Sequence, residues 1–171
     1  MVDGYSSRVI LSLGSNLGPS RKLLQNACRD LAVILDRIAL SRLYRTTPRD
    51  DLEQSDFLNM AVVGYTTAAP QEFLAICRNL EGKAERVRDP LRPKGPRTLD
   101  IDLVFFGDLC RGFEPEDLSI PHPRYRERGF VVVPILDVCP DCADPCDGTP
   151  LRAMAANLDD QGVYPVGNLT I

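Results

Sequence analysis

Hydrophobic residues recur with two different periods along this chain, and each period predicts a type of element. Four short apolar or alternating runs are typical of strands, at residues 8–13, 38–44, 57–66 and 97–106. Two longer segments repeat apolar residues every three or four positions, as one face of a helix does, from 20 to about 36 and from 70 to about 86–88. Ser20 is a plausible helix cap, and Pro70 suits a first helical position.

The predicted order is βαββαβ. This order is typical of the ferredoxin-like, split βαβ plan, an α+β sandwich in which two helices pack on one face of an antiparallel sheet. A polar stretch over 45–56 is expected to be a surface loop. Residues 112–171 are expected to form a C-terminal extension of loops and two short helices, near 125–138 and 149–157. We expect one domain, residues 1–171.

Composition narrows the class of protein. The chain has 171 residues, 44% hydrophobic and 26% charged, as in an ordinary globular domain. No apolar run approaches the roughly 20 residues that span a bilayer, and residues 1–7 lack the layout of a signal peptide. A net charge of −4 argues against a general nucleic-acid binder. We therefore expect a cytoplasmic enzyme for small molecules, with no membrane or nucleic-acid partner, and a monomer because nothing demands a second subunit.

The six cysteines do not resemble a secreted disulfide framework, which a reducing cytosol disfavours. Cys28 and Cys77 fall at apolar positions of the predicted helices and are expected to be core thiols. Cys139, Cys142 and Cys146 form a cluster that could hold zinc with a fourth ligand from elsewhere. The alternative is a surface loop with free thiols, which we favour because no second pair of ligands accompanies the cluster.

Asp100 and Asp102 form the sharpest chemical feature. Side chains two apart on a strand share a face, so both carboxylates point one way while Leu99, Ile101 and Leu103 point the other. Two adjacent carboxylates repel unless a cation joins them, and Mg²⁺ prefers such oxygen ligands. A solvated outer face is the alternative interpretation.

Basic residues gather just before this strand and after it. Arg86, Arg88 and Arg97 precede Asp100, and guanidinium groups suit phosphate oxygens. The single histidine, His122, lies between two prolines and close to Arg128. A solvated basic loop and a structural histidine are the simpler interpretations. Carboxylates for a metal together with arginines for phosphate are, however, the usual components of phosphoryl transfer.

At this point the sequence resembles a known family, the 6-hydroxymethyl-7,8-dihydropterin pyrophosphokinases of folate biosynthesis. Matching segments occur in family order over roughly residues 8–140, and the block 95–102 is the most specific. The others are 13–18, Tyr44-Arg45-Thr46 with Phe57-Leu58-Asn59, and 121–124 with 128–130. The resemblance implies an enzyme that transfers pyrophosphate from ATP to the pterin hydroxymethyl group and releases AMP.

The resemblance also implies roles for individual residues. Asp100 and Asp102 would hold two Mg²⁺ ions, and Arg86 and Arg97 would act on the phosphates during catalysis. ATP would be bound by Glu81, Arg88, Leu103, Ser119, His122 and Arg128. The pterin pocket would be formed by Thr46, Thr47, Pro48, Phe57, Asn59 and Phe130. An amide can hydrogen-bond the edge of a pterin, and two phenyl rings can sandwich it.

The chain departs from the family pattern in the loop before Gly95 and at Phe57, where relatives often carry tyrosine. Two other functions stay open on the residues alone. A kinase that moves only the γ-phosphoryl group would release ADP. A ferredoxin-like RNA-binding module would present stacking aromatics in a Lys/Arg-Gly-Phe type motif, which this chain lacks.

Overall fold

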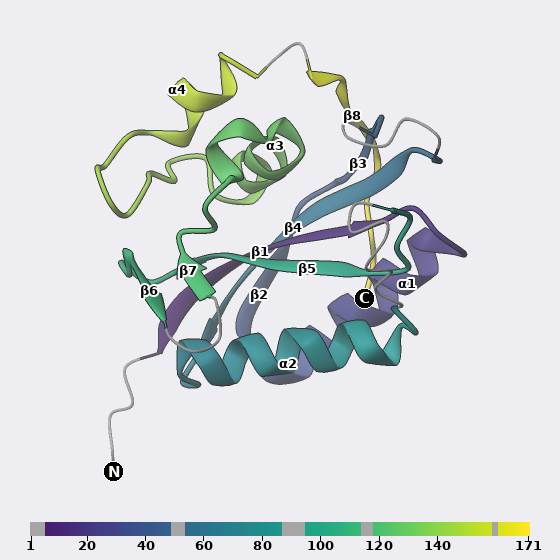
Figure 1. Cartoon of the computed structure of the whole chain (residues 1–171), viewed down its shortest axis with the longest axis horizontal. Helices are drawn as coiled ribbons and strands as arrows, with labels where there is room; N and C mark the ends of the chain where they lie inside the picture. The colour runs from purple at the N-terminus through teal and green to yellow at the C-terminus, as the bar shows by residue number, and fades with distance from the viewer. Residues whose placement is uncertain (1–5, 49–53, 87–94, 114–117, 159–160) are drawn as a thin grey trace.

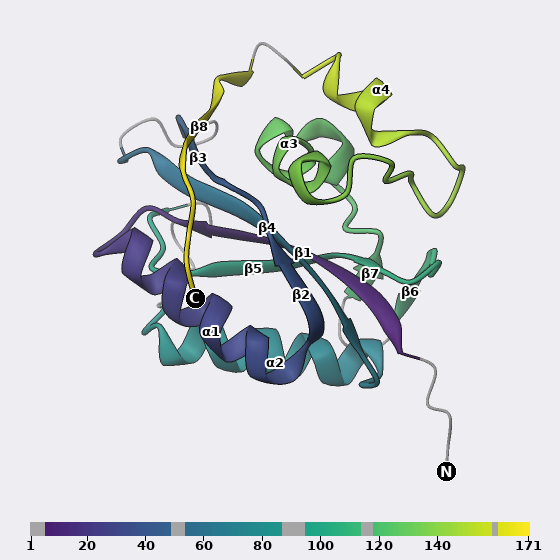
Figure 2. The same cartoon turned by 180° about the vertical axis from the view of Figure 1, so that it is seen from behind.

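The chain folds around one sheet. The computed structural model describes residues 6–48, 54–86, 95–113, 118–158 and 161–171, and Figures 1 and 2 show it from opposite sides. The strands of the sheet are β1 (Ser7–Ser15), β2 (Asp36–Leu40), β3 (Leu43–Thr46), β4 (Phe57–Thr66), β5 (Asp100–Phe106) and β8 (Val163–Gly167). Their order is β5-β1-β4-β3-β8, with β2 also paired to β4, and the pairs are antiparallel.

Two helices, α1 (Ser20–Ile34) and α2 (Pro70–Lys83), cover one face of this sheet (Figure 1). Their apolar stripes, which include Leu24 and Phe73, pack against Leu11 and Leu13 of β1 in one buried cluster. The ferredoxin-like α+β prediction is therefore confirmed, with its helices on one side. No helix in the described part of the chain combines the length and apolarity that crossing a membrane requires.

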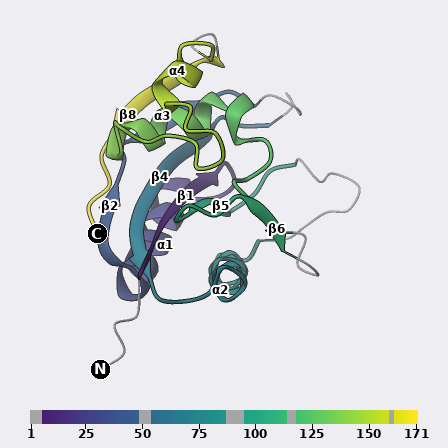
Figure 3. The ribbon, with the colours of Figure 1, turned by 90° about the vertical axis from the view of Figure 1, so that its left-hand side faces the viewer.

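The C-terminal extension covers part of the other face. It contains a 3₁₀ turn (Tyr125–Glu127), α3 (Gly129–Val138) and α4 (Leu151–Ala155), and Figure 3 shows α3 and α4 across the sheet from α1 and α2. A second apolar cluster lies beneath α3, where Val132 and Ile135 pack with Ile10 and Ala61. The two predicted short helices are thus present, each shorter than expected.

Three strands of the extension were not predicted: β6 (Arg111–Phe113), β7 (Leu118–Ile120) and β8. The first two form a small hairpin of their own. β8 pairs with β3 at the edge of the main sheet, and its side chains are almost all exposed. Because neither face of β8 is buried, its sequence carries no alternating pattern that would reveal it.

The predicted strand at 38–44 is two strands, and the boundary has a local cause. The Ser41 hydroxyl accepts a hydrogen bond from the Ala61 backbone N–H (2.8 Å) and donates one to the Arg42 carbonyl (2.7 Å). A side chain thus replaces a ladder bond between backbones. β5 likewise begins at Asp100, three residues later than predicted. The Arg97 N–H donates to Asn16 Oδ1 (2.8 Å) instead of entering the ladder.

α2 ends at Lys83, before the predicted boundary at 86–88. Glu85 has φ of 55°, the left-handed conformation that terminates a helix. The chain therefore leaves the helix axis, and Arg86 turns back toward β5. Residues 87–94, and with them Arg88, lie outside the described residues.

The cysteines only partly follow the expectations. Cys28 and Cys77 are core thiols as predicted, and burial raises the pKa of each to about 12. Cys146, however, forms a disulfide with Cys110, so the expectation of three free or zinc-bound thiols is wrong for it. The two partners are 36 residues apart: Cys110 lies between β5 and β6, and Cys146 lies between α3 and α4. Among the described residues no cluster of three or more metal-ligating side chains occurs.

Reduction of the Cys110–Cys146 disulfide should lower the free energy of unfolding by about 3–4 kcal/mol, because a loop of this length loses that much closure entropy when cross-linked. Urea unfolding with and without a reductant measures the difference. The Cys110→Ser/Cys146→Ser variant should show the lower free energy of unfolding both with and without the reductant. Equal stability of the two wild-type forms would contradict the expectation.

Candidate active site

The acidic pair stands on one face of the strand β5, as the alternation predicted. Asp100 and Asp102 lie opposite Gly14 and Ser12 of β1 in the antiparallel register. Ile101 and Leu103 point to the other face, into the cluster beneath α1 and α2. The same strand therefore anchors the core with one set of side chains and presents the carboxylates with the other.

Asp100 is held by two guanidinium groups. Arg86 Nη1 and Arg97 Nη1 each lie 2.6 Å from one of its carboxylate oxygens. Arg86 also pairs with Glu81, a buried carboxylate of α2. Glu81 Oε1 in turn accepts the backbone N–H of Ile101 at 2.9 Å. Glu81 thus ties the end of α2 to the edge of β5 and orients Arg86 at the same time.

Asp102 is paired less closely than Asp100. Arg128 Nη1 is 3.3 Å from its Oδ2, and His122 Nε2 is 3.8 Å from the same atom. Burial raises the pKa of Asp102 to about 6, and the charge of Asp100 adds to this effect while Arg128 opposes it. The carboxyl therefore carries charge that the free protein does not fully compensate.

His122 is a neutral hydrogen-bond donor at neutral pH. Burial lowers its pKa to about 4, and the charges of Arg128 and Arg124 lower it further. Its Nδ1 accepts the Arg124 backbone N–H at 3.2 Å, so we assign the ring proton to Nε2, which faces Asp102. The His122 backbone N–H donates to Val104 at 3.0 Å, which fixes the loop to β5.

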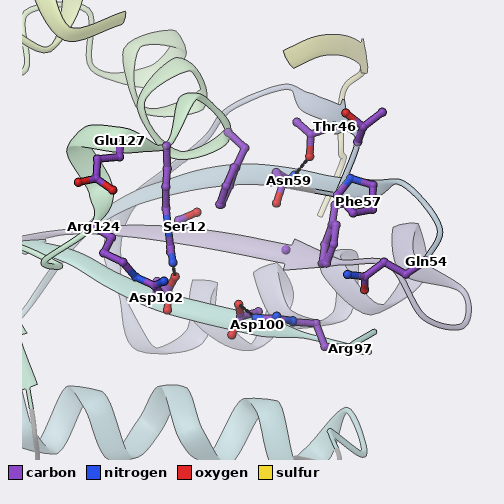
Figure 4. Close-up of a pocket in the computed structure, with 15 residues that line it drawn as sticks. Ser12, Thr46, Gln54, Phe57, Asn59, Arg97, Asp100, Asp102, Arg124 and Glu127 are labelled. Atoms are coloured by element: carbon purple, nitrogen blue, oxygen red, sulfur yellow. Dashed lines mark hydrogen bonds and ion pairs between the residues drawn. The ribbon is translucent and has the colours of Figure 1, made fainter. Parts of the chain in front are cut away.

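A cavity of about 370 Å³ opens beside the acidic pair (Figure 4). All six residues predicted for the pterin line it: Thr46, Thr47, Pro48, Phe57, Asn59 and Phe130. The buried Asn59 amide donates to Thr46 Oγ1 at 2.7 Å. A Cβ on Gly14 would lie 2.9 Å from Asn59 Oδ1, so a glycine is needed there to leave the amide in place.

Each of the two phenyl rings of this cavity lies beside an arginine that forms an ion pair with Asp100 or Asp102. The guanidinium carbon of Arg97 is 5.7 Å from the centre of the Phe57 ring, and that of Arg128 is 5.5 Å from Phe130. Such cation–π contacts join the apolar walls of the cavity to its charged end. A flat ring bound between the walls would therefore have its edge near Asp100 and Asp102.

A second cavity, of about 310 Å³, lies on the other side of the same carboxylates. Among its lining residues are Arg86, which was assigned a catalytic role, and all the predicted ATP residues that the structure describes: Glu81, Leu103, Ser119, His122 and Arg128. Arg88, the remaining one, lies outside the described residues. The two predicted sets, scattered along the sequence, thus form two adjacent cavities.

Several lining residues were not predicted. They are Ser12, Gly14, Gln54, Arg124 and Glu127 in the first cavity or its rim, and Leu74, Arg78, Ile101, Leu118 and Pro123 in the second. Ser12 and Gly14 share a face by strand alternation, and Arg78 precedes Glu81 by three residues on α2, so their spacing could have revealed them. Leu74, Ile101 and Leu118 lie on α2, β5 and β7, and the pattern of these elements shows them only as apolar positions. Gln54, Pro123, Arg124 and Glu127 depend on loop or turn conformations that carry no periodic signal.

Comparison with known proteins agrees with this geometry. The model of the 7,8-dihydro-6-hydroxymethylpterin-pyrophosphokinase family matches residues 10–140. The chain belongs to this family. A family member from Synechocystis, named 2-amino-4-hydroxy-6-hydroxymethyldihydropteridine pyrophosphokinase, is 36% identical over 92% of this chain and 79% of its own. A protein of the same name from Methylorubrum extorquens is 37% identical over 94% of this chain and 99% of its own length.

Solved structures show the fold. A Plasmodium falciparum HPPK-DHPS crystal structure with pteroate superimposes with a TM-score of 0.67 at 16% identity, over 92% of this chain. This chain spans 44% of the length of that plasmodial chain. Family membership therefore rests on the sequence match, and the superposition supports the ferredoxin-like plan of the pyrophosphokinase.

Asp102→Asn should stabilise the free pyrophosphokinase above pH 6 and lose this effect near pH 4. Because folding raises the pKa of Asp102 from 3.8 to about 6, its contribution to stability is complete below pH 4 and is lost as the pH rises through 6. The asparagine removes this loss, which is at most about 3 kcal/mol. Urea unfolding between pH 4 and 8 without Mg²⁺ measures it.

Asp137→Asn is the matched control with the opposite sign. Burial would raise the pKa of Asp137, but its hydrogen bonds from Arg42 outweigh burial and lower the pKa below its ordinary value. Its contribution to stability is therefore present above pH 4 and lost below. Parallel pH profiles for the two variants would contradict the assignment for Asp102.

Proposed function

We propose that the first cavity binds 6-hydroxymethyl-7,8-dihydropterin, that the second binds ATP, and that a pyrophosphoryl group passes between them at the acidic pair. One observation carries this proposal: the two cavities share their lining at Asp100 and Asp102. Two reactants bound in adjoining cavities are brought to reacting distance without further search. The family and the names of its relatives supply the reaction, a step of folate biosynthesis.

The pterin is recognised by the walls of the first cavity. The Asn59 amide, held by Thr46, provides both a donor and an acceptor for the pterin edge. Phe57 and Phe130 provide the apolar walls on which a flat ring stacks. The hydroxymethyl group then points to the charged end of the cavity, where Arg97 and Arg128 lie beside the rings.

Asp100 and Asp102 would hold two Mg²⁺ ions that enter with ATP. Two carboxylates are fewer oxygen ligands than Mg²⁺ requires, and no further metal-ligating side chain of the described residues completes a cluster with them. Phosphate oxygens and water would supply the rest. The raised pKa of Asp102 fits this role, because a cation compensates the buried charge. When bound, the ions neutralise the phosphates and orient them for displacement.

The arginines then exchange partners. In the free protein Arg86 and Arg97 neutralise Asp100, and a metal on that carboxylate would free them for phosphate oxygens. The pterin hydroxymethyl oxygen attacks the β-phosphorus in line. The bond from that phosphorus to the oxygen retained by AMP breaks, and the hydroxyl proton passes to solvent water. The nucleotide is bound in the second cavity by Glu81, Leu103, Ser119, His122 and Arg128. Arg88, the other residue assigned to ATP, lies outside the described residues.

The proposal takes residues 1–171 as one pyrophosphokinase domain that works as a monomer in the cytoplasm. Both apolar clusters pack on the same sheet, which supports one folding unit. A reducing cytoplasm would keep Cys110 and Cys146 as thiols, so an intact disulfide between them would contradict this location. The thiol content of protein isolated under alkylating conditions therefore tests the location.

Incubation with ATP, Mg²⁺ and hydroxymethyl-dihydropterin should release AMP. Asp100→Ala should lower this rate by at least about 10³-fold while the protein stays folded, because the metal and the phosphates lose a shared anchor. Chromatography of the nucleotides identifies the product and measures the rate for the wild type and for Asp100→Ala. Asp108→Ala, an exposed carboxylate just beyond the end of β5, is the matched control and should keep full activity. Release of ADP would instead identify a γ-phosphoryl kinase, and full activity of Asp100→Ala would exclude the metal role.

Asn59→Ala should weaken pterin binding about 10- to 100-fold and leave nucleotide affinity unchanged, because a buried donor and acceptor for the ring edge are lost. Fluorescence titration with a hydroxymethylpterin measures the first, and calorimetry with a non-hydrolysable ATP analogue the second. Thermal unfolding verifies the fold, since the bond to Thr46 is lost too. Asn26→Ala, exposed on α1, is the control. Unchanged pterin affinity in Asn59→Ala would refute the pocket assignment.

A further inference from the structure

Arg124 occupies a distinctive position between the two cavities. Five residues line both of them: Arg97, Asp100, Asp102, Arg124 and Arg128. If the cavities hold the two substrates, these five side chains surround the group in transit. Four of them already have a role in the proposed function, and Arg124 has none.

Arg124 differs from the other junction arginines in its pairing. Arg97 is paired with Asp100 and Arg128 with Asp102. Within the described part of the chain, no carboxylate forms an ion pair with the exposed side chain of Arg124. Figure 4 shows this side chain directed from its loop toward Asp102. Its guanidinium group is thus aimed at the junction and free to bind an anion there.

The backbone of Arg124 is fixed even though its side chain is exposed. Its N–H donates to His122 Nδ1 at 3.2 Å, and its carbonyl accepts the Glu127 N–H at 3.3 Å. The side chain therefore starts from a defined place, next to a histidine that lines the second cavity. A fixed origin reduces the entropy that the side chain loses when it binds.

The electrostatic surroundings of Arg124 favour an incoming anion. Its charge lowers the pKa of both His122 and Arg128, after the larger effect of burial on each. Positive groups this close destabilise one another until an anion joins them. Arg126, two residues further on, shows the contrast: it pairs with Asp144 and Asp147 away from both cavities.

We propose that Arg124 is a further catalytic residue, which binds the pyrophosphoryl group at the junction of the two cavities during its transfer. The inference rests on the proposed function and adds a guanidinium group to it. Negative charge spreads over the non-bridging oxygens of the group in transit, and a planar guanidinium binds two such oxygens at once. Because the contact is strongest in transit, Arg124 acts on turnover more than on the binding of either substrate.

The test compares Arg124→Ala and Arg124→Lys with Arg29→Ala, an exposed arginine on α1 that lines neither cavity. With both substrates saturating, Arg124→Ala should lower kcat about 10- to 100-fold, as loss of one charged hydrogen-bonding group implies. Arg124→Lys should recover part of the loss, and Arg29→Ala should match the wild type. The affinity of Arg124→Ala for a hydroxymethylpterin and for α,β-methylene ATP should stay within about threefold, and its melting temperature should not change.

Two results would overturn the assignment while leaving the proposed function intact. The first is a kcat of Arg124→Ala within twofold of an active wild type. The second is a loss confined to substrate affinity, or shared by Arg29→Ala, which would make Arg124 a binding group or a contributor to general charge. A wild type that forms no AMP would overturn the proposed function and this inference together.

Discussion

Charge compensation around Asp100 and Asp102 is the constraint on which the site depends. The pair stands on a strand whose other face is buried, so neither carboxylate can turn away without moving Ile101 and Leu103 out of the core. A shift of one residue in register would exchange the two sets of side chains. Fold and chemistry are therefore fixed by the same ladder between β1 and β5.

Compensation in the free protein comes from arginines that are anchored elsewhere. Arg86 is oriented by the buried Glu81, and the main chain at Arg97 is fixed by Asn16. Such pairs fix the positions of the two guanidinium groups beside Asp100. They also explain why Asp102, whose ion pair is longer, is the carboxyl whose pKa burial raises. The better-paired carboxylate is the one nearer the end of α2.

The sequence predicted what depends on local periodicity and on motif. Alternation alone placed Asp100 and Asp102 on one face, and helical spacing placed Cys28 and Cys77 in the core. The family resemblance named residues that the structure groups into two cavities. Prediction from the sequence failed where tertiary contacts determine the structure. The break at Ser41 arises from a hydroxyl that bonds across strands, and the Cys110–Cys146 pairing from a fold that joins distant loops.

The two faces of the sheet also explain why this ferredoxin-like fold suits small anionic ligands. In an RNA-binding sheet of this type, the face away from the helices stays open for bases to stack. Here α3 and α4 lie over that face and bury Ile10 and Ala61 (Figure 3). What stays open is the strip at the ends of β1, β4 and β5, where Gly14, Asn59 and Asp100 lie side by side in register. Covering most of the face leaves this strip for ligands, and Arg128 lies beside it, where the covering helix α3 begins.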